Sequence, residues 1–190
     1  MATNFVGGVQ KIRVAPAVQT EGAITTGLAS AIEIEFIAMD TVQYTENSDT
    51  TEDLKAEDKD YTILSFQTDG DPDQIVISVL QQKPEVLAMF ENIVYTPATT
   101  KIVGLAKRKV ADVMFEITTR SMKDNRKQVI VLPNVSVVKS TDGNLTKNGV
   151  QRMVLTGKVG AFKTTTGNLD AKYIKTWVTD AGAPIDSTIV

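Results

Sequence analysis

The residues best suited to chemistry stand in one short stretch, TDGDPDQ at 68–74, where Asp69, Asp71 and Asp73 alternate. Carboxylates at this spacing open the calcium loop of an EF-hand, which also needs glycine at its sixth position and a bidentate glutamate at its twelfth. Those two positions hold Gln74 and Leu80, and strand-like runs rather than helices flank the stretch. Because Asp, Gly and Pro are also turn residues, we interpret DGDPD as a hairpin turn rather than a metal site.

Other routes to catalysis are narrow. The chain contains no cysteine and no histidine, which excludes thiolate nucleophiles, Cys/His zinc sites and imidazole bases. Glu33 and Glu35 share one face of an expected strand, but two carboxylates need a substrate cleft to act as an acid–base pair. The glycines of TGKVG at 156–160 precede no helix, so they indicate a bulge or a close backbone contact rather than a phosphate loop. We therefore expect a protein that is not an enzyme and uses no cofactor, with a carboxylate-based hydrolase left open as an alternative.

Charge is divided strongly along the chain. The net charge is −3, yet residues 40–73 carry eleven acids against two lysines, and residues 101–175 carry fifteen bases against five acids. This division is typical either of two solvated faces or of self-complementarity, in which the acidic segment of one copy meets the basic part of the next. The basic residues are spread along strands without interleaved aromatic residues, which argues against nucleic-acid binding.

The elements that position these residues are mostly strands, because hydrophobic residues alternate with polar ones along most of the chain. In AIEIEFIAM (31–39), alternation puts Ile32, Ile34, Phe36 and Ala38 on one face and the two glutamates on the other. In VADVMFEITTR (110–120), Asp112, Met114 and Glu116 form the face opposite the apolar one. We expect further strands at 9–15, 61–68, 74–81, 101–106, 127–138, 151–162 and 171–179.

One helix is predicted at about 83–93, where Pro84 suits the first helical position and Glu85 suits the first turn. Val86, Leu87, Phe90 and Ile93 follow at helical spacing, as in a helix that covers a sheet. The segment 40–60 is polar and acidic, so it forms either a long protruding hairpin or a mobile loop. Trp177, the only tryptophan, is expected to fill the core or a subunit contact.

With 190 residues, the chain has the length of one domain, and no apolar run approaches the ~20 residues that span a bilayer. We expect a single domain over 1–190, with an N-terminal arm at about 1–8 and a C-terminal arm at about 179–190. The N-terminus lacks the layout of a secretory signal, so we expect synthesis in the cytoplasm and no membrane partner.

The order of these parts resembles a known family. A strand with alternating glutamates (AIEIEFIAM) leads into the acidic segment, then into DKDYTILSFQTDGDPDQIVISVL, the short helix KPEVLAMFEN and a strand-rich second half. This pattern is similar to the major tail tube protein of bacteriophages with long non-contractile tails, which belongs to a superfamily with contractile-tail tubes and the type VI secretion tube.

The resemblance implies a mainly β fold, a β-sandwich or half-barrel with one short flanking helix, whose subunits close a shared barrel in hexameric rings. The rings stack into a tube that conducts DNA on ejection, so the location would be the tail of a virion made in a bacterial host. Partners would be further copies of the chain, the tape measure, terminator and distal tail proteins, and DNA in transient passage without sequence-specific binding.

The resemblance also implies two sets of functional residues. The acidic residues facing the lumen would be Glu33, Glu35 and Glu116. The hairpin that reaches the neighbouring ring would be Thr41–Asp60, with Glu46, Asp49, Glu52, Asp53, Glu57 and Asp58 in the contact. A monomeric β-sandwich binding module, for carbohydrate or for another virion protein, remains the alternative function.

Overall fold

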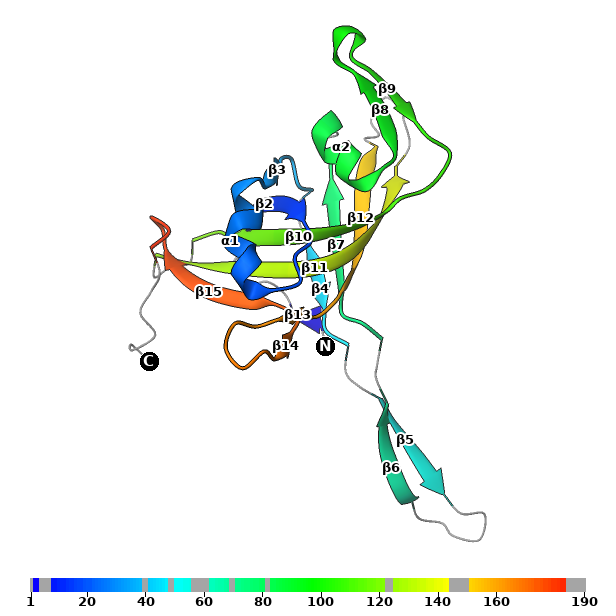
Figure 1. The fold of residues 1–190 in the computed structure, drawn as a ribbon, viewed down its shortest axis with the longest axis vertical. Coiled ribbons are helices and arrows are strands. Elements are labelled where there is room, and N and C mark those ends of the chain that lie inside the picture. The colour runs from blue at the N-terminus through cyan, green and yellow to red at the C-terminus, as the bar shows by residue number, and fades with distance from the viewer. Residues whose placement is uncertain are drawn as a thin grey trace.

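The computed structural model describes residues 2–3, 8–38, 41–47, 50–55, 62–68, 71–80, 83–121, 125–143 and 151–183, with the backbone alone at 2–3, 50–55 and 62–68. The protein is mainly β and is built around one large antiparallel sheet (Figure 1). Its strands lie in the order β1-β4-β7-β12-β11-β10-β2-β3, and β15 pairs with β11 beside this path.

The nine strands of this sheet are β1 (Ala2–Thr3), β2 (Val9–Pro16), β3 (Ile32–Ile34), β4 (Gln43–Thr45), β7 (Gln74–Val79), β10 (Val110–Thr119), β11 (Arg126–Asp142), β12 (Arg152–Val159) and β15 (Ile174–Thr179). Three pairs form separate two-stranded sheets: β5 (Thr50–Lys55) with β6 (Thr62–Thr68), β8 (Ile93–Thr96) with β9 (Lys101–Gly104), and β13 (Phe162–Lys163) with β14 (Asp170–Ala171). The helices are α1 (Ile24–Ala29) and α2 (Pro84–Phe90), with short 3-10 turns at Glu21–Ala23 and Pro97–Thr99. Every run expected to be a strand contributes at least part of one.

The strand β11 organises the sheet. Its residues from Val129 to Val138 pair with β10 along one edge. On the other edge, β15 pairs with Arg126–Val131 and β12 pairs with Val135–Asp142. Two strands therefore share one edge of a 17-residue strand, and the chain between them leaves the sheet to form the β13–β14 hairpin.

The main core lies on one side of this sheet and is closed by α2. Val86, Leu87 and Phe90 of the helix are buried, and the Phe90 ring stacks on Phe115 of β10 with centroids 6.4 Å apart. Pro84 occupies the start of the helix. The predicted helix and its role in covering the sheet are thus confirmed, although α2 ends at Phe90 and Ile93 begins β8.

A second hydrophobic cluster lies on the opposite side of the sheet, on the face of 110–120 that alternation puts opposite the apolar one. Met114 is fully buried there with Ala15, Ile24, Val131 and Phe162. The helix α1, which was not predicted, covers this side (Figure 1). Its residues Thr25, Thr26 and Gly27 have weak helix propensity, so the sequence gives little indication of a helix here.

The expected strand 31–39 is wrong after Ile34. Phe36 adopts a left-handed backbone with φ 53° and is 67% exposed, so it does not lie on the apolar face. Ile37 instead packs against the main core and forms a bridge with Val79 of β7. One residue in this conformation moves the inward position from Phe36 to Ile37, which a strict period of two cannot predict.

DGDPD is not a hairpin turn, because the two strands that flank it do not pair with each other. The strand β6 pairs with β5 in a separate ribbon, whereas β7 pairs with β4 and β12 in the main sheet. The ribbon, which we call the arm (β5 and β6), extends away from the body (Figure 1). The expected protruding hairpin therefore exists, but its second strand is 62–68 rather than part of 40–60.

Gly157 explains the glycine pattern in TGKVG. It lies inside β12 with unbroken register to both neighbouring strands, so there is no bulge at this residue. A Cβ at this position would come within 2.6 Å of Val135 Cγ1 and 2.9 Å of Ile75 Cγ2. The close-contact interpretation is confirmed for this glycine.

Candidate functional site

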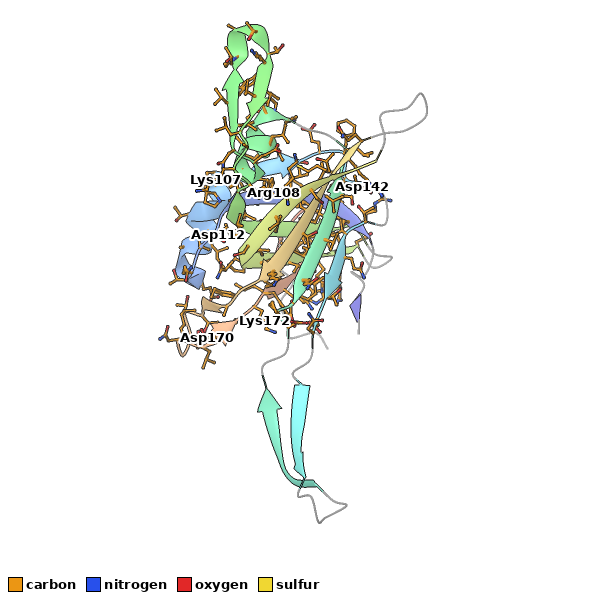
Figure 2. All side chains as sticks on the ribbon, turned by 90° about the vertical axis from the view of Figure 1, so that its right-hand side faces the viewer. Lys107, Arg108, Asp112, Asp142, Asp170 and Lys172 are labelled. Carbon is orange, nitrogen blue, oxygen red and sulfur yellow. The ribbon has the colours of Figure 1, made fainter. Side chains whose placement is uncertain are left out.

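The arm begins and ends at a polar cluster around the buried Asp73, which we call the arm root: Tyr44, Asn47, Asp73 and Lys172. Tyr44 lies on β4 opposite Ile75 of β7, so the chain enters the arm after β4 and leaves it just before β7. Asp73 is only 2% exposed, and its carboxylate accepts hydrogen bonds from the Tyr44 hydroxyl at 2.8 Å and the Asn47 N–H at 3.1 Å. Lys172, which is labelled in Figure 2, adds an ion pair to Asp73 at 3.1 Å.

The electrostatics of the arm root favour an ionised Asp73. Burial alone would raise its pKa, but the donors of Tyr44, Asn47 and Lys172 outweigh burial and hold the pKa below its ordinary value. Burial also raises the pKa of the Tyr44 phenol, and the carboxylate beside it raises that pKa further. Tyr44 therefore stays a protonated donor while Asp73 stays a charged acceptor.

The carboxylate of Asp73, which a cation bound by the alternating aspartates would need, already accepts these hydrogen bonds. The described residues hold no group of three or more carboxylate, histidine or cysteine side chains positioned for a metal. Asp71 is exposed, and Asp69 lies outside the described residues. Asp73 therefore links the chain segment that leads into the arm with the segment that leads out of it. The Asn47 side chain adds to this link by donating a hydrogen bond to the Pro72 carbonyl at 2.9 Å.

The three acids expected at the lumen are each matched by a base. Glu33 pairs with Lys11 at 2.6 Å, and Glu35 pairs with Lys83 at 2.5 Å. Both side chains remain more than two-fifths exposed. These pairs leave little net negative charge on this part of the surface.

Glu116 differs from the other two because it is almost buried. Its carboxylate accepts two hydrogen bonds from the Arg13 guanidinium, at 2.8 and 2.6 Å, across the paired strands β10 and β2. The hydrogen-bonded carboxylate raises the pKa of Arg13. Glu116 therefore joins two strands rather than presenting a free charge to solvent.

Of the six residues expected to stack against a neighbouring ring, three belong to the described part of the chain. Glu46 follows β4 beside the arm root, and Glu52 and Asp53 belong to β5 in the arm. Asp49, Glu57 and Asp58 lie outside the described residues. The arm itself is a two-stranded ribbon whose register pairs Leu54 with Leu64 and Glu52 with Phe66.

A second projection was not anticipated as a functional element. The β8–β9 hairpin extends from the body at the end opposite the arm (Figure 1). It exposes Val94, Tyr95, Ile102 and Val103, and Leu105 follows it, also exposed. The sequence signal that could have revealed it is the apolar run IVY before the turn and the run IVGLA after it. These runs look like strands of the core, and only the structure shows that they stand apart from it.

Comparison with protein-family models and with curated proteins does not assign the chain to a family. No helix among the described residues is both long and apolar enough to span a membrane. Trp177 is 40% exposed on β15, so it is not a core residue of the isolated subunit. No protein-family model and no curated protein matches the sequence.

Proposed function

We propose that this chain is a structural subunit that assembles with copies of itself into stacked hexameric rings, forming the tail tube of a bacteriophage. The observation that carries the proposal is the pair of β ribbons projecting from opposite ends of the body (Figure 1). Two-stranded ribbons alone are marginally stable in water. Ribbons that project from both ends are therefore suited to repeated contact between copies.

Several further features support a role in assembly. The arm lies in the segment 40–73, with a net charge of −9, and β9 begins the segment 101–175, with a net charge of +10. A contact between unlike surfaces on successive copies generates open filaments rather than closed dimers. In the proposed tube, sheets of neighbouring subunits would join into one barrel, with Glu33 and Glu35 on the wall that DNA passes.

The proposed location is the tail of a virion, with tape measure, terminator and distal tail proteins as further partners. The purified full-length chain tests the proposal directly. Negative-stain electron microscopy and native mass spectrometry over rising concentrations are expected to show rings or tubes with sixfold symmetry. A compact monomer at every concentration, with no assembly on crowding or prolonged incubation, would contradict the proposal and favour the monomeric binding module.

A further inference from the structure

The β8–β9 hairpin carries apolar side chains on both of its faces. Val94 pairs with Val103 and Tyr95 pairs with Ile102, so neighbouring cross-strand pairs point to opposite sides. These four side chains and Leu105 are between 38% and 53% exposed. A ribbon that exposes hydrophobic residues on both faces is typical of a surface that another chain covers.

Positive charge accompanies this apolar surface. Lys101 is exposed within the hairpin, and Lys107 and Arg108 are exposed just after it (Figure 2). The sequence from 92 to 111 contains no aspartate or glutamate. A partner that fits this surface should therefore combine apolar residues with negative charge.

The arm has this combination. Its register puts the positions of Leu54, Leu64 and Phe66 on one face of the β5–β6 ribbon, because Leu54 pairs with Leu64 and Glu52 with Phe66. The sequence from 50 to 68 carries five acids against two lysines. The arm of one chain and the hairpin of another are thus complementary in both charge and hydrophobicity.

The two elements cannot meet within one subunit. Figures 1 and 2, viewed at right angles, both place the arm and the hairpin at opposite ends of the body. We propose that the β8–β9 hairpin, with Lys101, Lys107 and Arg108, is the surface that receives the β5–β6 arm of the next copy. This inference rests on the proposed self-assembly and names the surface on which it depends.

A charge-reversal experiment tests the contact. One variant, the receiver variant, carries Lys101→Glu, Lys107→Glu and Arg108→Glu. A second, the arm variant, carries Glu52→Lys and Asp53→Lys, the two acids of β5. Each variant alone presents like charges at every junction, so each is expected to stay unassembled. An equimolar mixture restores opposite charges at every junction and is expected to recover assembly, seen as rings or tubes by electron microscopy.

The mixture separates this inference from the proposed function. If the wild-type chain assembles and both variants assemble equally well alone, the hairpin is not the receiving surface, although self-assembly stands. If the wild-type chain does not assemble, the proposed function fails before the variants are compared. Circular dichroism and thermal unfolding must match the wild type for each variant, and the rescue by mixing shows that the subunits remain competent.

Net charge and nucleic-acid binding are distinguished by two controls. Reversing Lys158, Lys163 and Lys175, three exposed lysines outside the hairpin, changes the net charge equally and is expected to preserve assembly. Loss of assembly in this control as well would overturn the inference. So would a receiver variant that assembles normally but no longer retains a labelled DNA oligonucleotide, because the hairpin would then serve DNA.

The apolar part of the contact has its own matched pair. Replacing Val94 and Val103 with serine removes one exposed cross-strand pair from the hairpin and is expected to raise the critical concentration for assembly at least tenfold. Val110 and Val138 form an exposed cross-strand pair on β10 and β11, at 63% and 43% exposure. The same replacements there are expected to leave the critical concentration within twofold, and equal effects from the two pairs would contradict the assignment.

Discussion

The hydroxyl of Tyr44 donates a 2.8 Å hydrogen bond to the buried carboxylate of Asp73, joining the chain just before the arm to the chain just after it. Lys172, which follows β14, closes the same cluster from the C-terminal part of the chain. Because the arm is a two-stranded ribbon outside the main sheet, its direction depends on how its root is held. The arm root is therefore the joint that connects the body to the proposed assembly element.

Replacing Asp73 with asparagine is expected to lower the free energy of unfolding by about 1–3 kcal/mol, because three donors lose a charged acceptor in a buried place. Urea denaturation followed by far-ultraviolet circular dichroism measures this change. Asp71→Asn is the matched control, since Asp71 is exposed two residues away, and it should change stability by less than about 0.5 kcal/mol. Equal losses in the two variants would show that the arm root does not stabilise the protein.

The stabilisation from Asp73 should depend on pH in a defined direction. Its folded-state pKa lies below the ordinary value of 3.8, so the fold favours the ionised form. The contribution is fully present above the unfolded-state pKa and is lost as pH falls through the lower folded-state pKa. The difference in unfolding free energy between wild type and Asp73→Asn should be constant from pH 7 to about 5 and shrink below about 4. A difference that grows on acidification would have the wrong sign.

Removal of divalent cations is expected to change neither stability nor assembly. Asp73 already accepts hydrogen bonds from Tyr44, Asn47 and Lys172. Its carboxylate oxygens would have to leave these donors before they could coordinate a cation. Thermal unfolding and electron microscopy in excess EDTA and in millimolar calcium should agree. A rise in melting temperature with calcium that Asp71→Asn abolishes would restore the metal interpretation of Asp69, Asp71 and Asp73.

Gly157→Ala is expected to destabilise the fold by about 1–3 kcal/mol, because the added methyl group would overlap Val135 and Ile75 in the core. Gly104→Ala is the matched control. Gly104 also lies in a strand, β9, but nothing stands within 4 Å of the position its Cβ would take. Denaturation midpoints of the two variants give the comparison, and an unchanged midpoint for Gly157→Ala would show that the core yields at this point.

Replacing Glu33 and Glu35 with lysine should preserve folding, because exposed ion pairs contribute only about 0–1 kcal/mol each. The change turns two neutral pairs, with Lys11 and Lys83, into four cations. If these residues line the proposed conduit, the DNA backbone, with about one charge per ~1.7 Å of duplex axis, would be retained by the wall. Slower ejection from assembled virions is the expected result. A density map of the tube with both side chains on the outer wall would contradict the lumen assignment.

Strands were predictable because inward and outward residues alternate, and β2, β6 and β7 lie within a residue or two of the expected ranges. The end of β3 was not predictable, since neither the left-handed backbone of Phe36 nor the bridge between Ile37 and Val79 is marked by the local alternation. The burial of Met114 was not predictable, because α1 has too little helical pattern to reveal that it covers this face of the sheet.

For the candidate site, too, the sequence predicted one part and not the other. The acidic character of the arm could be read directly from composition, whereas the role of Asp73 could not. Its partners Tyr44 and Lys172 lie 29 and 99 residues away along the chain, and such distant contacts leave no local spacing to detect. Of the β8–β9 hairpin, only β9 lay in an expected strand, 101–106, whereas Ile93 was assigned to the helix. The isolation of the hairpin from the core is a property of the three-dimensional arrangement.

The topology also sets the order in which the protein can mature. Arg13 of β2 meets Glu116 of β10, 103 residues later, and β11 completes its pairing only when β15 arrives near the C-terminal end. Contacts of such long sequence separation make folding slow, because chain entropy must be lost before they form. During translation, β2 can pair early with β3, but its other edge stays unpaired until β10 has been made. Exposed strands in that interval are prone to aggregate, so we expect the yield of native subunit to rise when synthesis is slowed or cooled.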